Sequence, residues 1–116
     1  MVQKIIYWLE HGVEIHAPAL ASYEVANGLT RLIVANAFPA DQVQDALNEI
    51  SLLPIIYHFL EQTSRTIEIA LTLGRQSAYD AAYIALTEAL GSELWTLDGP
   101  LYRNASEKGF PVRLLS

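Results

Sequence analysis

Apolar residues recur along the chain at two spacings, the spacing of amphipathic helices and the alternation or short apolar runs of strands. Helical spacing, with Pro, Ser or Gly near the ends, predicts helices over residues 3–10, 18–37, 39–51, 63–73, 78–90 (capped by Ser77) and 101–108. Short apolar segments predict strands over residues 13–17, 54–59, 93–97 and 110–115, the second of them buried. Residues 3–10 also fit a strand, because Ile5, Ile6, Tyr7 and Trp8 are good strand formers.

Strands that are separated by helical crossovers form parallel sheets with helices on their faces. The pattern therefore predicts an α/β fold, a three-layer α/β/α arrangement around a short parallel sheet. Neither an internal repeat nor a linker interrupts the pattern, so residues 1–116 are expected to form one domain. The visible strands are few for a doubly wound sheet.

Composition narrows the class of protein. Of the 116 residues, 52% are hydrophobic and 17% are charged, which favours a folded globular chain over disorder. The absence of cysteine excludes disulfides and thiol chemistry and suits a cytoplasmic protein. The apolar runs are too short to span a membrane, and the sequence shows no signal peptide. A net charge of −6 argues against a protein that coats nucleic acid, but it suits a basic protein partner.

Three acidic residues are expected at one edge of the sheet. Glu24 lies near the start of the helix after strand 13–17, Asp80 lies in the first turn of helix 78–90, and Asp98 follows strand 93–97. Helix starts and strand ends meet at the carboxyl edge of an open α/β sheet, where such sheets bind ligands. Converging carboxylates suit a hard divalent cation, Mg²⁺ or Mn²⁺.

Each acid also has a purely structural interpretation. Ser77 to Asp80 fits a capping box, Glu24 complements a helix dipole, and Asp98-Gly99 is an ordinary turn signal. The argument for a site therefore depends on the three acids lying together.

The other candidate residues give weaker signals. The three histidines, at positions 11, 16 and 58, lack the local pairing of a metalloprotease helix and are expected to be structural. Arg31, Arg75 and Arg103 fit either phosphate contacts or solvated surface. The sequence has no nucleophile elbow for acyl transfer and no glycine-rich phosphate loop.

Four segments resemble the PIN-domain family, and together they cover nearly the whole chain. Residues 77–91 (SAYDAAYIALTEALG) resemble the family's third-acid motif, and residues 94–102 (LWTLDGPLY) its fourth-acid strand. Residues 17–29 (APALASYEVANGL) resemble the helix of the second acid, and residues 109–112 (GFPV) resemble the closing strand. The pairing of the third-acid motif (residues 77–91) with the fourth-acid strand (residues 94–102) at this spacing is fairly specific, whereas residues 17–29 alone would be weak.

The resemblance implies a fold, a site and an activity. Glu24, Asp80 and Asp98 would be metal ligands and catalytic residues, with Thr96 hydrogen-bonded in support and Asn27 facing the same cleft. The family hydrolyses RNA phosphodiesters with Mg²⁺ or Mn²⁺. Many members are toxins that act as homodimers and are silenced by an antitoxin protein, so RNA, an antitoxin and a second copy are the expected partners.

The sequence departs from the family's pattern before Glu24. PIN domains usually begin with a strand that bears an Asp, whereas residues 1–23 contain no Asp and only two acids, Glu10 and Glu14. We therefore expect an N-terminally truncated PIN-like fold without the first metal ligand. A misassigned start, a degenerate relative or a strand supplied by another chain would each explain this. The alternative function is a non-catalytic PIN-like protein that binds an antitoxin or RNA.

Overall fold

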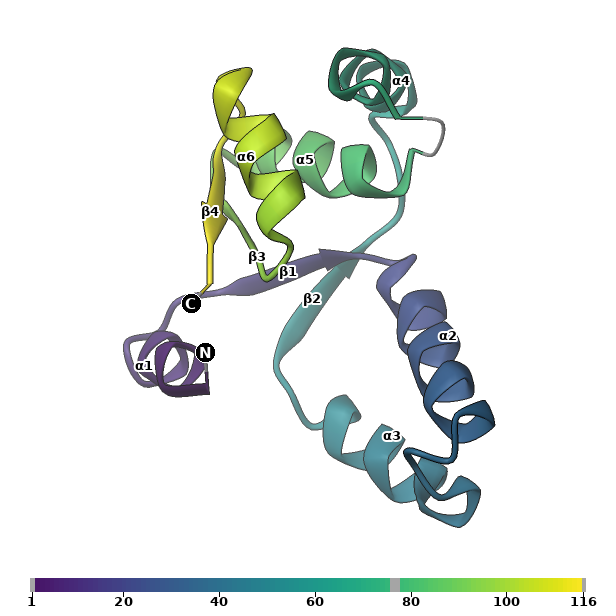
Figure 1. Ribbon diagram of the computed structural model, residues 1–116. Helices are drawn as coiled ribbons and strands as arrows, with labels where there is room; N and C mark the ends of the chain where they lie inside the picture. Colours follow the sequence, from purple (N-terminus) through teal and green to yellow (C-terminus); the bar gives the residue numbers. More distant parts are fainter. Residues whose placement is uncertain (1, 76–77, 116) are drawn as a thin grey trace. The chain divides into compact units, whose positions relative to one another are not determined.

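The structure is a computed structural model that describes residues 2–75 and 78–115 (Figure 1). The chain divides into two compact units, one of residues 1–13 and 59–116 and the other of residues 14–58. The first is called unit 1 and the second unit 2, and each is described by itself. Within the described ranges, no helix is long and apolar enough to cross a membrane.

Unit 1 is built from helices around one pair of parallel strands. Strand β3 (Leu94–Thr96) pairs with β4 (Val112–Leu114) in the register Leu94↔Val112 and Thr96↔Leu114. The helices are α1 (Val2–Glu10), α4 (Thr63–Leu73), α5 (Tyr79–Leu90) and α6 (Gly99–Glu107). Helix α4 contacts α5, and α6 contacts both β3 and β4, as Figure 1 shows. These contacts place the hydrophobic core between α4, α5, α6 and β4.

Small residues let the helices of unit 1 approach closely. The largest fully buried side chains are Ile69, Ile84 and Val112, and the rest of the core is mainly alanine and leucine: Ala70, Leu73, Ala81, Ala85, Leu101 and Ala105. Alanine combines high helix propensity with a short side chain, so it supports both the helix and the close contact. The core of unit 1 is therefore contiguous although its side chains are small.

Two glycines end the core helices as the sequence predicts. Gly74 follows α4 with φ of 71°, and Gly91 follows α5 with φ of 61°. Both lie in the left-handed region, which costs other residues steric strain. The turn at Gly91 leads α5 into β3 within three residues. The start of α5 and the end of β3 therefore lie towards the same edge of the strand pair.

Helix α1 packs on β3 through aromatic and cationic side chains. The rings of Trp8 and Trp95 lie edge to face with centroids 5.4 Å apart, and Lys4 Nζ lies 4.2 Å from the centroid of the Trp95 ring. Such contacts add stability beyond the buried area. The helical interpretation of residues 3–10 is thus confirmed, and Trp95 serves as a half-buried packing residue.

Unit 2 contains one parallel strand pair and two amphipathic helices. Strand β1 (Ile15–Pro18) pairs with β2 (Ile55–His58) in the register Ile15↔Ile55 and Pro18↔His58. Between them lie α2 (Ala21–Val34), the short 3₁₀ helix η1 (Ala40–Gln42) and α3 (Val43–Ser51). Neither α2 nor α3 contributes a buried residue.

The prediction of a buried strand over residues 54–59 is wrong in its burial. The strand forms, but Ile56 is 42% and Tyr57 is 47% exposed. A run of apolar residues is typical of a strand whose two faces are both covered by other elements. The run itself does not supply those elements. Here no residue of α2 or α3 is buried, and apolar side chains of β2 remain exposed.

The α/β class and the parallel pairing of the strands are confirmed. In place of one short sheet, the described strands form two separate parallel pairs. Among the described strands, β1 pairs with β2 and β3 pairs with β4. Some helix bounds differ by two or three residues from those predicted. Helix α2 begins at Ala21 rather than Pro18, and α6 begins at Gly99 rather than Leu101. The expected cap Ser77 lies outside the described residues, and α5 begins after Ala78.

Candidate metal centre

Asp98 links a strand to a helix and is held at both its backbone and its side chain. It follows β3 and is the N-cap of α6, where its Oδ1 accepts a hydrogen bond from the Leu101 N–H at 3.0 Å. Its own N–H donates to Thr96 Oγ1 at 3.1 Å. The helix cap satisfies an N–H that would otherwise lack a partner. Asp98 therefore has the structural role in the turn that the sequence indicated.

Capping does not use up the carboxylate of Asp98. An ionised carboxylate has two oxygens and about four lone-pair directions. The Leu101 N–H occupies one of these directions, and the side chain is exposed at the end of β3. The cap fixes the side chain while leaving acceptor capacity for a cation. The Thr96 hydroxyl, predicted to support the site, orients the backbone on which this carboxylate stands.

Asp80 lies in the first turn of α5, and the structure leaves it half-buried. The two residues that follow it, Ala81 and Ala82, are buried, so the start of this helix is anchored in unit 1. Helix α5 contacts β3 and leads into it, which directs Asp80 and Asp98 towards the same edge of the β3–β4 pair. The capping-box interpretation of Asp80 requires Ser77, which lies outside the described residues.

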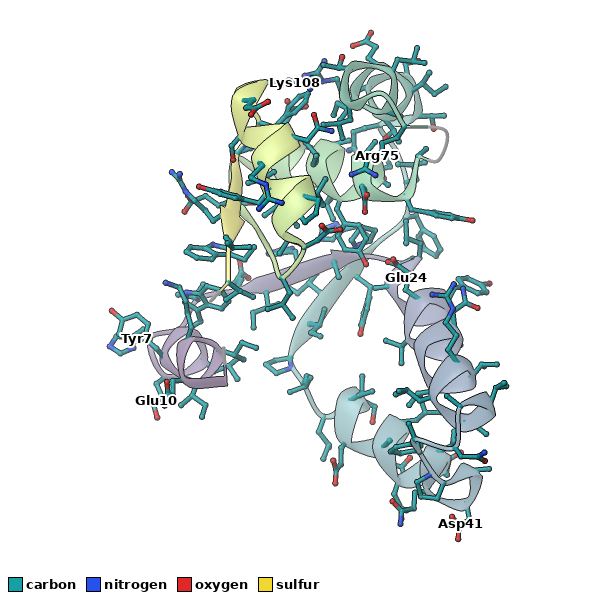
Figure 2. All side chains as sticks on the ribbon, viewed as in Figure 1. Tyr7, Glu10, Glu24, Asp41, Arg75 and Lys108 are labelled. Carbon is teal, nitrogen blue, oxygen red and sulfur yellow. The ribbon has the colours of Figure 1, made fainter. Side chains whose placement is uncertain are left out.

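Glu24 lies in the first turn of α2, in unit 2, as Figure 2 shows. Its backbone N–H donates to the Leu20 carbonyl at 3.1 Å, so it belongs to the opening turn of the helix. Asn27 follows one turn later, and both side chains are exposed. Because Asp80 and Asp98 belong to unit 1, the convergence of all three acids stays a prediction. Within residues 2–75 and 78–115, no group of three or more acidic or histidine side chains is placed to hold a metal ion.

Arg103 brings a positive charge to the turn that carries Asp98. Its Nη1 lies 3.2 Å from the position that a Cβ on Gly99 would take. A guanidinium can fold over the start of α6 in this way because residue 99 has no side chain. Arginine binds phosphate oxygens through a planar fork of donors. Of the three arginines considered from the sequence, Arg103 is thus the one that this contact places beside Asp98-Gly99.

The comparison with known proteins decides the family. A model of the PIN domain matches residues 3–107. The chain belongs to the PIN domain family. It is 35% identical over 103 residues to ribonuclease VapC3 of Pyrobaculum aerophilum, covering 85% of this chain and 73% of that protein.

Two mycobacterial relatives extend this likeness. VapC ribonuclease Mb0985 of Mycobacterium bovis and ribonuclease VapC9 of Mycobacterium tuberculosis are each 38% identical over 85 residues, which cover 72% of this chain. The matched segment spans 65% of each of those proteins. The PIN-family resemblance of the sequence is confirmed, and these relatives are named as ribonucleases of the VapC type.

Proposed function

We propose that this chain is a metal-dependent endoribonuclease of the PIN toxin type. The observation that carries the proposal is Asp98, a carboxylate held at the end of β3 by Thr96 and by the start of α6. Asp80 begins the helix that leads into the same strand. This arrangement occurs in a chain that belongs to the PIN domain family and has relatives named as ribonucleases. Glu24 of α2 is the third proposed ligand.

The donor chemistry of these residues fits a hard divalent cation. Asp80, Asp98 and Glu24 offer carboxylate oxygens, the ligands that Mg²⁺ and Mn²⁺ prefer. Such a cation supplies Lewis-acid stabilisation of the phosphate charge and a water of lowered pKa. Thr96 keeps Asp98 in place, and Asn27 is proposed to support Glu24 from the next turn of α2. Arg103, whose guanidinium lies over Gly99, is proposed to contact a phosphate oxygen of the RNA backbone.

The proposed partners follow from the family and from the charge. A net charge of −6 suits a basic antitoxin segment better than an acidic one. A homodimer is also proposed, because α2 and α3 of unit 2 bury no residue and expose apolar side chains. Large exposed apolar patches are typical of surfaces that bind another protein chain.

A calorimetric Mn²⁺ titration and an RNA-cleavage assay on the same protein test the proposed function. Asp80→Asn and Asp98→Asn should each abolish cleavage and weaken Mn²⁺ binding, because each variant removes a ligand charge and keeps the shape. Asp41→Asn is the matched control, since Asp41 is an exposed acid of η1 outside the proposed centre. Equal cleavage by all four proteins would contradict the proposal.

One observation supports a different function, a non-catalytic PIN-like binding protein. Glu10 and Glu14 are the only acids before Glu24, so residues 1–23 offer no Asp as a further ligand. Absence of Mn²⁺ binding and of cleavage in the parent protein, together with binding of an antitoxin peptide or RNA, would favour this function.

A further inference from the structure

Two of the three histidines meet across the strand pair of unit 2. In the register, His16 of β1 lies opposite Ile56, and His58 of β2 lies opposite Pro18. Side chains alternate between the two faces along a strand, so both histidines stand on the same face of the pair as diagonal neighbours. Both side chains are half-buried, so the strand pairing holds them in place while solvent and its protons still reach them.

The two rings face each other nitrogen to nitrogen. His16 Nδ1 lies 2.7 Å from His58 Nε2, and the ring centroids are 5.0 Å apart. These two distances place the nitrogens head to head along the line between the rings, which is the geometry of a hydrogen bond. Such a bond needs a proton on one of the two nitrogens and a lone pair on the other, whichever ring is the donor.

The charge of the pair decides whether this hydrogen bond can form. When both rings are neutral, one ring donates and the other accepts. When one ring takes up a further proton, the bond becomes charge-assisted and therefore stronger. When both rings are charged, every ring nitrogen carries a hydrogen and no lone pair is left to accept. Two positive charges then also face each other at hydrogen-bonding distance, which is repulsive.

Glu14 supplies a negative charge beside the pair. Its Oε1 lies 3.6 Å from His16 Nε2, so it attracts a positive charge on the His16 ring. Its side chain is exposed, which lets water and salt screen the attraction, and one carboxylate can offset one ring charge but not two. Tyr57, the other titratable residue of β2, adjoins His58 along the strand and therefore points to the opposite face.

We propose that His16 and His58 form a proton-sensitive latch, which holds β1 against β2 until both rings are charged. The closed latch carries at most one extra proton, whereas the two histidines of an open segment each take up a proton in acid. The open state therefore binds more protons, so acidification favours opening and a rise in pH favours closure. Histidine side chains ordinarily titrate at about pH 6.5, so the latch responds to mildly acid conditions.

Opening of the latch acts on the segment that leads into α2. The Ala19 N–H, just after β1, donates to the His58 carbonyl at 2.7 Å, so the residue that carries one ring also holds the chain between β1 and α2. Helix α2 begins at Ala21 and carries Glu24. The latch thus links proton concentration to the order of the chain before α2, and it does not depend on the proposed nuclease function.

Hydrogen exchange of the Ala19 amide, measured by NMR as a protection factor, tests the latch. Between about pH 7.5 and pH 5, the protection factor of the parent protein should fall by about 10-fold or more, because one excluded proton shifts the opening equilibrium about 10-fold per pH unit. His16→Gln and His58→Gln leave one ring beside an amide that can donate or accept, so their protection factors should stay nearly constant.

His11→Gln is the matched control and should behave like the parent, because His11 is an exposed histidine of unit 1. A parent protection factor that does not change with pH would overturn the proposal. An equal fall in the parent, His16→Gln and His58→Gln would overturn it as well, since the fall would then not come from the pair.

Nitrogen NMR of the parent protein decides the question even if a histidine variant does not fold. The imidazole nitrogen shifts record how many protons each ring carries at each pH. His16 and His58 should titrate together in two separate steps, because the first proton keeps the second away until the latch opens. Independent single-step titration of the two rings would overturn the proposal, whatever the outcome for nuclease activity.

Discussion

At the scale of single residues, Asp98 combines local structure with chemistry. It caps α6 through the Leu101 N–H, and it presents a carboxylate at the end of β3. The two roles need different properties of the same side chain. The cap requires only an acceptor oxygen, whereas a cation also requires the negative charge.

Substitutions at Asp98 should therefore separate stability from metal binding. Asp98→Asn keeps an acceptor oxygen, so it should change stability little and lower Mn²⁺ affinity. Asp98→Ala removes the cap as well and should cost about 1 kcal/mol of unfolding free energy. Urea denaturation without metal measures the unfolding free energy of each variant, and calorimetry measures its Mn²⁺ affinity. Equal unfolding free energies for Asp98→Asn and Asp98→Ala would contradict the expectation that the retained acceptor oxygen preserves the cap.

The ion pair between Arg65 and Glu88 predicts a pH dependence. Arg65 Nε and Nη2 donate to the two carboxylate oxygens of Glu88 at 2.8 and 2.9 Å, which joins α4 to α5. Hydrogen bonding to Arg65 holds the pKa of Glu88 below its ordinary value of 4.5, although partial desolvation opposes this. The stabilisation is thus complete above about pH 4.5 and is lost as pH falls through the lower folded-state pKa.

Glu88→Gln should lower the melting temperature by a few degrees at pH 7, a modest effect because the pair is partly exposed. The difference from the parent should shrink as the pH falls through the lowered folded-state pKa of Glu88, because the carboxylate is then protonated. Glu107→Gln, at an exposed position on α6, is the control. A difference that stays constant from pH 7 to pH 3 would contradict the role of this ion pair.

At the scale of elements, stability is concentrated where α4, α5 and α6 meet. Ile84 of α5 is fully buried in this core, whereas Leu71 on α4 is 73% exposed. Ile84→Ala should cost about 2–5 kcal/mol of unfolding free energy and Ile84→Val about 1 kcal/mol, because a larger cavity loses more contacts. Leu71→Ala should change little. Denaturant titration of the three variants measures this order, and a cost for Leu71→Ala equal to that for Ile84→Ala would refute it.

At the scale of the whole molecule, unit 2 exposes many large apolar side chains. They lie on α2, on α3, between α3 and β2, and on β2: Tyr23, Leu32, Val34, Leu47, Leu52, Leu53, Ile56 and Tyr57. If a second copy covers this surface, folding is coupled to association, and dilution should lower the melting temperature. Tyr23→Ser should weaken that concentration dependence. A melting temperature that does not change with concentration would contradict the proposed homodimer.

The sequence by itself determined the local structure, because local signals act over a few residues. Helical spacing, Gly74 and Gly91 placed α4 and α5 almost to the residue, and the pairing of Asp80 with Asp98 indicated the family. The sequence also identified the candidate acids, because the order of helices and strands shows which residues lie near helix starts and strand ends, where α/β sheets bind ligands.

Only the tertiary structure decided which residues from distant segments meet. Burial depends on what covers an element, so the exposed apolar residues of β2 could not be read from an apolar run. The contact between His16 and His58 joins residues 42 positions apart, and only strand pairing with its register brings their rings together. The same holds for Arg65 and Glu88, whose attraction requires α4 and α5 to pack before the charges come within reach.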